Sequence, residues 1–302
     1  MKKVLIITIT ILIIPVIIKK TLENNPKEKK YNLEKNIQVR LKREKKNKIE
    51  KIPLEKYLIG VLAGEMPISY DMEALKAQAV AARTYTIKKI EQNKNKEYDL
   101  VDTTNDQVYK DEQELKEKWE ENYENNIKKI KQALEQTTGE YMIYEGKPIH
   151  AFFFSTSSGI TENCKDVFGE NLPYLVSVSS TWDEKSPSYN GEQTITKKEF
   201  CEKLEINCEK IDIKIERNET NSINKIIINN KEIKGTEFRF KLGLKSTNVE
   251  IEESNDMIII KSKGYGHGVG MSQYGAKELA SIGYTYDKIL KYYYKGIELK
   301  KI

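Results

Sequence analysis

One glutamate in this chain occupies a position where the sequence pattern calls for an apolar side chain. In residues 54–67, LEKYLIGVLAGEMP, apolar side chains recur at three- and four-residue spacing on one helix face, and the next position on that face is Glu65. Pro67 disfavours helical geometry at the residue before it, so the helix should end about one residue after Glu65. The spacing therefore predicts a carboxylate at a helix end that faces the protein interior or a cleft.

Such a carboxylate supports two interpretations. Removal from water raises the pKa of a carboxyl group, and a glutamic acid that keeps its proton near neutral pH is what general-acid cleavage of a glycosidic bond requires. The alternative is a structural Glu65 paired with a base such as Arg83, since perturbed groups are only probabilistic markers of function. Arg83 is in turn either the structural partner of a carboxylate or a hydrogen-bond donor to a sugar.

A second group of residues with chemical potential lies in residues 264–275, GYGHGVGMSQYG. Its first four glycines alternate with other residues, so the backbone can take positive φ or approach a ligand closely. The polar groups of His267, Ser272, Gln273 and Tyr274 suit hydrogen bonding and ring stacking with a sugar. The loop lacks the G-x-x-x-x-G-K-[ST] pattern of a phosphate loop. His267 taken alone can equally be a packed, hydrogen-bonded histidine.

Helices and short strands should alternate around these two segments. The patterns predict, in chain order, a hairpin over residues 37–52, an alanine-rich helix over 72–91 that packs against the Glu65 helix, a long charged helix ending near Thr138, a hairpin over 141–154, and two short helices between 276 and 296. The predicted fold class is α+β, with mixed helices and short antiparallel strands forming a catalytic core, a smaller α+β lobe, and one N-terminal membrane anchor helix.

The chain divides into five predicted segments. They are a signal-anchor over residues 1–20, a basic linker over 21–36, the first part of the catalytic core over 37–195, the smaller lobe over 196–263, and a C-terminal segment over 264–302 with the glycine-rich motif and closing helices. In the lobe we expect a helix ending near Leu204, strands at 211–215 and 226–228, a turn at Asn229 and Asn230, a helix at 237–242 and a strand pair ending near Lys261.

The N-terminal segment combines an apolar run with basic flanks. Residues 4–18 form an apolar run that is short for a spanning helix, and no small-residue cleavage site follows it, which favours an uncleaved signal-anchor. By the positive-inside rule alone, the basic excess after this run would keep the rest of the chain in the cytoplasm. The location of the rest of the chain therefore has to be inferred from its function. The chain has a net charge of +5, but residues 19–56 alone exceed that value, so the remainder is slightly acidic and gives no support for nucleic-acid binding.

The three cysteines are too few for a disulfide framework. A bridge between Cys201 and Cys208 can form outside the cell, and the sequence leaves its redox state open. There is no CxxC pair, and the chain has only the histidines His150 and His267, so a complete metal site is hard to assemble.

Several strings together resemble a known family. In order along residues 37–296 they are VLAGEMP, EALKAQAVAARTY, DTTNDQVY, STSSGITEN, PYL and GYGHGVGMSQYGA. The combination resembles the family of stage II sporulation protein D, the peptidoglycan lytic transglycosylases of spore-forming bacteria, and the related amidase-enhancer proteins.

The resemblance implies a single-pass protein of the mother-cell membrane, with its catalytic domain on the extracytoplasmic side facing the forespore. Its activity would be cleavage of the β-1,4 bond between N-acetylmuramic acid and N-acetylglucosamine in peptide-stripped glycan strands, giving 1,6-anhydro ends during engulfment. The family's catalytic glutamate falls on Glu65. The implied partners are the amidase stage II sporulation protein P and the membrane protein stage II sporulation protein M.

Eight residues are candidates for holding the sugar: Tyr70, Arg83, Gln107, Ser155, His267, Ser272, Gln273 and Tyr274. Relatives often carry a histidine where this chain has Asn105 and Asp106, so no role of that histidine is carried over. Some relatives hold zinc through cysteines near the STS loop. Only Cys164 and His150 lie near that loop here, so we expect no metal and no other cofactor.

Two other functions remain open at this stage. A hydrolytic muramidase would need a second carboxylate, for which Glu73, Asp102 and Asp106 are available. A non-catalytic activator of a cell-wall amidase would bind glycan through the same residues without cutting it, and it would tolerate the loss of Glu65.

Overall fold

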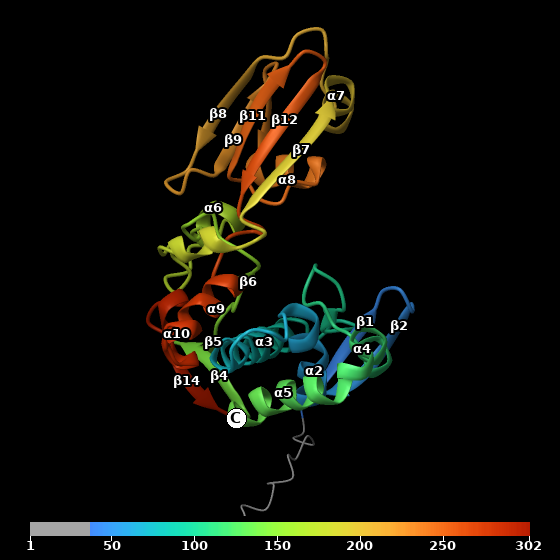
Figure 1. Ribbon diagram of the computed structural model, residues 1–302, viewed down its shortest axis with the longest axis vertical. Coiled ribbons are helices and arrows are strands. Elements are labelled where there is room, and N and C mark those ends of the chain that lie inside the picture. The colour runs from blue at the N-terminus through green and yellow to red at the C-terminus, as the bar shows by residue number, and fades with distance from the viewer. Residues whose placement is uncertain (1–36) are drawn as a thin grey trace, which may run out of the picture. The chain divides into compact units, whose positions relative to one another are not determined.

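The computed structural model describes residues 37–302, so the predicted signal-anchor (1–20) and basic linker (21–36) lie outside the described residues. Helices and short strands are mixed along the chain (Figure 1), and the strands form small sheets of two or three members. This arrangement confirms the α+β class. Within residues 37–302, the helices are all too short or too polar to cross a membrane.

A hairpin opens the described chain, as predicted. Strands β1 (Gln38–Arg43) and β2 (Lys48–Pro53) pair antiparallel, and β3 (Leu100–Val101) adds to β1 in parallel. Val39 and Leu41 alternate with more exposed neighbours and are fully buried. Helix α2 (Leu54–Glu65) follows β2 without a loop, so the hairpin sets the direction in which this helix begins.

The next two helices agree with the periodicity of the sequence. The apolar face of α2 is buried, and the helix ends at Glu65 because Met66, which precedes a proline, adopts extended geometry. Helix α3 (Met72–Gln92) packs against α2, α9 and α10. Its alanines are fully buried, and their small side chains allow this close approach.

The predicted long charged helix is two helices. Helix α4 (Glu112–Trp119) and helix α5 (Tyr123–Gln136) are separated by the 3-10 turn η1 (Glu120–Asn122), where Glu120 has a φ of 45°. The break falls where several glutamates crowd successive turns, and like charges three or four residues apart destabilise a helix. The apolar periodicity that continues through this region gave no sign of it.

The second predicted hairpin forms only in its first half. Strands β4 (Glu140–Tyr144) and β5 (Lys147–Pro148) turn at Glu145 and Gly146, both at positive φ. The ladder ends with Pro148 opposite Ile143, and beyond it only the N–H of Ile149 donates to β4, to the carbonyl of Met142 at 3.3 Å. Strand β6 (Phe153–Phe154) instead pairs in parallel with β13 (Met271–Ser272), and β14 (Glu298–Lys301) occupies the other edge of β4.

The smaller lobe has its own apolar core, in which Phe200, Ile226 and Ile258 are fully buried. The first strand of the lobe, β7, begins before residue 196, the predicted start of the lobe. It does so because it pairs along its whole length with β12, the last strand of the lobe. Cys201 and Cys208 form a disulfide, and Cys164, outside the lobe, is a buried free thiol. The elements are β7 (Asn190–Thr196), α7 (Lys197–Leu204), β8 (Ile213–Arg217), β9 (Ile223–Ile228), β10 (Lys231–Lys234), α8 (Gly235–Leu242), β11 (Val249–Ser254) and β12 (Met257–Lys263).

The glycine-rich loop connects β12 to helix α9 (Gln273–Ser281), which is followed by α10 (Tyr286–Tyr293). All four alternating glycines take positive φ, as the sequence indicated. A Cβ on Gly268 would lie 2.5 Å from Cγ of Glu162, and one on Gly270 would overlap the carbonyl of Phe152. The glycines therefore allow close approach to the protein's own segment 152–162, which contains the STS loop. That segment leads into α6 (Cys164–Phe168) and η2 (Thr181–Lys185).

Replacement of Gly60 by alanine tests the packing of α2. In a free helix this change would stabilise by about 1 kcal/mol. Here the new Cβ would overlap the carbonyl of Lys110 and the ring of Tyr109. We expect Gly60→Ala to lower the free energy of unfolding by about 1–3 kcal/mol, measured by urea denaturation. Lys56→Ala at an exposed position of the same helix is the matched control, and a Gly60→Ala protein more stable than the parent would contradict this packing.

Candidate active site

Glu65 lies at the C-terminal end of α2 and is largely withdrawn from water. Its Oε1 accepts a hydrogen bond of 2.5 Å from the backbone N–H of Val108. Burial raises the pKa of Glu65 from 4.5 to about 7, and the donors from Val108 and Gln273 oppose this rise without cancelling it. At neutral pH this carboxyl group is therefore close to half protonated.

Glu65 has no cationic partner in the described part of the chain, and the structural interpretation of the sequence does not hold. Arg83 is fully buried and pairs with Glu55 instead, through Nε to Oε1 and Nη2 to Oε2, each at 2.8 Å. Its Nη1 donates to the carbonyl of Glu140 at 3.0 Å. Because all three nitrogens of its guanidinium are engaged, Arg83 has the structural role. No cation stabilises the charged form of Glu65, so the pKa of Glu65 stays high.

Two glycines bring the hydrogen-bond donor to Glu65. A Cβ on Gly64 would lie 2.5 Å from the carbonyl oxygen of Val108, and the N–H of Lys110 donates to the carbonyl of Gly60 at 3.3 Å. Segment 108–110 can therefore lie directly on the helix surface beside the carboxylate. Sequence reasoning missed this role, although glycines four residues apart before Glu65 were a visible signal.

Tyr85 contributes a neutral hydroxyl to the surroundings of Glu65. Burial, followed by the charge of Asp106 and a hydrogen bond to it, raises the pKa of Tyr85, and the negative charge of Glu65 adds to the effect. The hydroxyl donates to Oδ1 of Asp106 at 2.9 Å, while Oδ2 of Asp106 accepts the N–H of Val101 at 2.9 Å. Lys89 pairs with the same carboxylate at 2.6 Å. This network holds the Tyr85 ring in place and was not anticipated.

The glycine-rich segment reaches Glu65 through its last residues. Gln273 begins α9, and its amide faces Glu65 closely enough to lower the pKa of that carboxyl group. The Nε2 of Gln273 is nevertheless buried without a hydrogen-bond partner of ordinary geometry. The next residue, Tyr274, packs edge-on against Tyr70 with ring centroids 6.5 Å apart. The structure thus brings Gln273 to Glu65 and Tyr274 to Tyr70.

His267 holds the glycine-rich loop. Its Nδ1 accepts the N–H of Val269 at 3.1 Å, and it is hydrogen bonded to the backbone of Phe153. The ring lies among those of Phe152, Phe154 and Phe168, at centroid distances of 6.0, 5.6 and 5.3 Å. Burial and then the nearby charge of Arg239 lower the pKa of His267 to about 4, so it is neutral at pH 7. This is the packed histidine that the sequence left open.

Three other predicted sugar contacts also serve the fold. Gln107 is fully buried and accepts hydrogen bonds from Tyr57 at 3.2 Å and Thr86 at 3.0 Å. Ser272 is fully buried, caps α9 and donates to Asp183 at 2.9 Å. The carbonyl of Ser155 accepts the N–H of Tyr274 at 3.0 Å, while its side chain stays partly exposed. Of these three, only Ser155 retains a surface that a ligand can reach.

The residues near the STS loop do not fit zinc. In the part of the chain that the structure describes, no three His, Cys, Asp or Glu side chains gather as metal ligands do. Burial raises the pKa of Cys164 to about 11, so its thiol keeps its proton, whereas zinc binds the thiolate. The ring of His150 stacks on Phe152 with centroids 5.6 Å apart. We therefore derive no step through a metal.

Comparisons with known proteins identify relatives of this chain. A sequence model of the family described as "Stage II sporulation protein" matches residues 42–144, the segment that contains Glu65 and Val108. Stage II sporulation protein D of Bacillus subtilis (strain 168) is 44% identical over 269 residues, covering 84% of this chain and 76% of that protein. The protein of the same name from Bacillus amyloliquefaciens is 42% identical over 272 residues, covering 88% and 79%.

The chain belongs to the stage II sporulation protein D family, because identity at this level extends over most of both sequences. A more distant relative is named "Amidase enhancer", from Bacillus subtilis (strain 168). It is 30% identical over 299 residues, which cover 80% of this chain and 40% of that relative.

The raised pKa of Glu65 predicts an unusual dependence of stability on pH. Between pH 4.5 and about 7 the folded protein holds a proton that the unfolded chain releases, so the folded state loses stability as the pH rises through this window. Glu65→Gln removes the titrating group. We expect this variant to exceed the parent at pH 8 by on the order of 2 kcal/mol, and to match it near pH 4.5. Urea unfolding at the two pH values measures the difference, and an equal gap at both would contradict the raised pKa.

Proposed function

We propose that the chain is a peptidoglycan lytic transglycosylase of sporulation, with Glu65 as both its acid and its base. The observation that carries this proposal is a carboxyl group with a pKa of about 7 and no cationic partner within residues 37–302. General acid–base catalysis is most efficient when the catalytic pKa lies near the working pH. Membership of the stage II sporulation protein D family supports action on the cell wall.

The reaction needs a single carboxyl group. Protonated Glu65 donates its proton to the β-1,4 glycosidic oxygen between N-acetylmuramic acid and N-acetylglucosamine, the C1–O bond breaks, and an oxocarbenium-like centre develops at C1. Glu65, now a carboxylate, takes the proton from the C6 hydroxyl of the same muramic residue as its oxygen bonds to C1. The products are a 1,6-anhydro end and a free 4-hydroxyl, and Glu65 recovers its proton.

The groups around Glu65 suit both halves of this cycle. Burial favours the protonated acid before the first transfer. After that transfer the N–H of Val108 and the amide of Gln273 stabilise the carboxylate, because donors favour the charged form. Neither group is a cation, so the carboxylate remains basic enough to accept the second proton.

The three carboxylates that a hydrolytic muramidase could use are already engaged. Glu73 accepts the N–H of Tyr286 at 2.8 Å, and Asp102 pairs with Arg43 at 2.7 Å. Asp106 is held by Tyr85 and Lys89. A general base that activates water needs a free carboxylate at a set distance from the acid. The single-carboxylate mechanism is therefore the one that these contacts favour.

The proposed setting is the extracytoplasmic face of the mother-cell membrane during engulfment. The Cys201–Cys208 disulfide supports an oxidising compartment, because disulfides persist outside the cytoplasm. Peptide-stripped glycan strands are the proposed substrate. The amidase stage II sporulation protein P, which removes stem peptides, and stage II sporulation protein M are the proposed partners.

Product analysis tests the reaction. The full chain incubated with peptide-free glycan strands should give 1,6-anhydromuramic ends, detected by mass spectrometry as the loss of one water per new end. Glu65→Gln should lower the rate at least 100-fold, since it removes the proton donor and acceptor. Glu91→Gln, at an exposed glutamate of α3, is the matched control and should cleave like the parent.

Other products would assign the chain to another function. Reducing ends would make it a hydrolase, and anhydro ends from Glu65→Gln at the parental rate would remove Glu65 from catalysis. Uncut strands together with faster turnover by an added amidase would favour the activator role that the name of the more distant relative suggests.

The rate should also depend on pH in a defined direction. Because the first step requires the protonated form of Glu65, and its pKa is about 7, kcat/KM should fall about tenfold per pH unit above pH 7. Initial rates between pH 6 and 9 measure this decline, with far-UV circular dichroism confirming that the protein stays folded. A rate that is constant from pH 6 to 9 would exclude Glu65 as the acid.

A further inference from the structure

Arg239, at the end of α8, has a guanidinium group that the protein itself does not neutralise. Its Nε donates to the carbonyl of Leu244 at 3.2 Å, and neither Nη1 nor Nη2 has a hydrogen-bond or ion-pair partner in residues 37–302. Arg43 and Arg83, by contrast, pair with carboxylates, and Arg217 donates to two carbonyls through both of its terminal nitrogens. Arg239 thus presents the part of a guanidinium that binds carboxylates in a bidentate manner.

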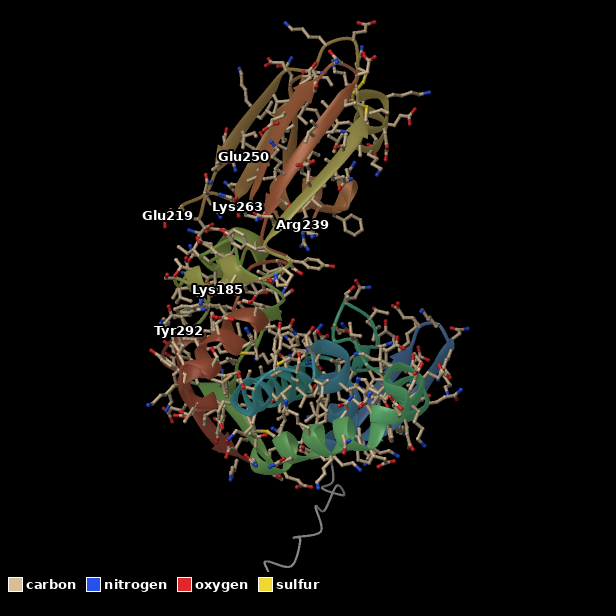
Figure 2. All side chains as sticks on the ribbon, viewed as in Figure 1. Lys185, Glu219, Arg239, Glu250, Lys263 and Tyr292 are labelled. Carbon is tan, nitrogen blue, oxygen red and sulfur yellow. A yellow bond between two sulfur atoms is a disulfide. The ribbon has the colours of Figure 1, made fainter. Side chains whose placement is uncertain are left out.

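The exposed ring of Tyr265 lies near Arg239, which Figure 2 labels on α8, and the ammonium of Lys245 lies over that ring. The ammonium of Lys245 is 5.9 Å from the ring centroid of Tyr265, and Lys245 forms no ion pair within the described residues. Tyr265 is 46% exposed, and Phe240, next to Arg239 in the chain, is 87% exposed. The carbonyl of Lys245 accepts the N–H of Gly266 at 3.0 Å, which joins these groups to the glycine-rich loop.

Burial lowers the pKa of Arg239, and the nearby phenol of Tyr265 opposes this effect. Partial removal from water makes an unpaired cation costly and strengthens its attraction to an incoming anion. The same charge lowers the pKa of His267, so Arg239 lies close to the middle of the glycine-rich loop. A half-buried cation without a counter-ion is most readily explained by a ligand that supplies one.

The same loop links this group to Glu65. Tyr265 stands near one end of the loop and Gln273, which faces Glu65, at the other. They are eight positions apart in the chain, so their Cα atoms lie at most roughly 29 Å apart. A glycan strand longer than this distance can therefore contact both groups.

We propose that Arg239, Lys245 and Tyr265 form a subsite for a carboxylate-bearing sugar of the glycan strand that Glu65 cleaves. The proposal rests on the proposed function for the identity of the strand. Arg239 binds the carboxylate through its two terminal nitrogens, Lys245 adds positive charge, and the ring of Tyr265 packs against the apolar face of the sugar. The carboxylate belongs either to the lactyl group of a peptide-free muramic residue or to a stem peptide.

Binding assays with chemically altered strands test the subsite without relying on cleavage. The full chain carrying Glu65→Gln is titrated by calorimetry with peptide-free strands, the same strands with methyl-esterified carboxyl groups, and strands with intact stem peptides. We expect esterification to weaken binding about tenfold, since a hydrogen-bonded charge pair is lost. Tighter binding of peptide-free strands assigns the carboxylate to the lactyl group, and tighter binding of intact strands assigns it to the peptide.

Variants of the cluster locate the effect. In the Glu65→Gln background, Arg239→Gln should bind unmodified strands about tenfold more weakly and no longer distinguish them from esterified strands. Arg239→Lys should restore part of the difference, because it keeps the charge and loses the bidentate geometry. Lys245→Gln, at an exposed position where folding is not at risk, should weaken binding about threefold. Lys198→Gln, on the exposed surface of α7, is the matched control and should bind like the parent.

The outcomes separate this proposal from the proposed function. If esterified and unmodified strands bind equally well, or if both Arg239→Gln and Lys245→Gln bind like the control, the subsite is overturned, even where the chain with Glu65 intact forms anhydro ends. If binding depends on the carboxylate and on Arg239, but the chain with Glu65 intact leaves the strands uncut, the subsite stands and the catalytic function fails.

Discussion

The structure depends on keeping one carboxyl group out of water without giving it a cation. If Glu65 were fully exposed to solvent, its pKa would be that of an ordinary glutamate. If it paired with Arg83, its pKa would be lower still, and it would be ionised at neutral pH. Two contacts prevent these outcomes. Segment 108–110 lies on the glycine face of α2 and covers the carboxylate while donating a single backbone N–H. Glu55 occupies Arg83 through two hydrogen bonds of 2.8 Å. The pKa of about 7 follows from the burial of Glu65 and equally from the absence of the Arg83 guanidinium beside it.

The glycine-rich loop is built first for packing and then for the site. Its alternating glycines take positive φ so that the loop can lie against segment 152–162, and His267 fixes the loop with its ring nitrogens. Because the loop is held in this way, Gln273 lies beside Glu65 at the start of α9, close enough to lower the pKa of that carboxyl group.

Periodicity identified Glu65, the bounds of α2 and the alternating glycines because each is encoded by neighbouring residues. What the sequence could not supply was the choice of partner. The pattern placed Glu65 on the inward face and offered Arg83 as a partner, but which carboxylate meets Arg83 depends on how α2 and α3 cross. The donor to Glu65 comes from Val108, 43 residues further along the chain. The structural roles of Gln107 and Ser272 likewise arise from packing between distant segments.

The separation of Arg239 from Glu65 along the loop has a physical reason. A glycan strand that carries carboxylates is attracted by positive charge, but a cation within about 4–6 Å of Glu65 would lower its pKa by roughly 1–3 units and remove the proton that the first step of the proposed reaction needs. A bound substrate carboxylate near Glu65 would act in the opposite sense and raise that pKa. Binding charge and catalytic acid can therefore coexist only at different sites. Arg239, near the middle of the loop and without a counter-ion, can attract the strand. Glu65, at the end of the loop and with neutral donors only, can retain its proton.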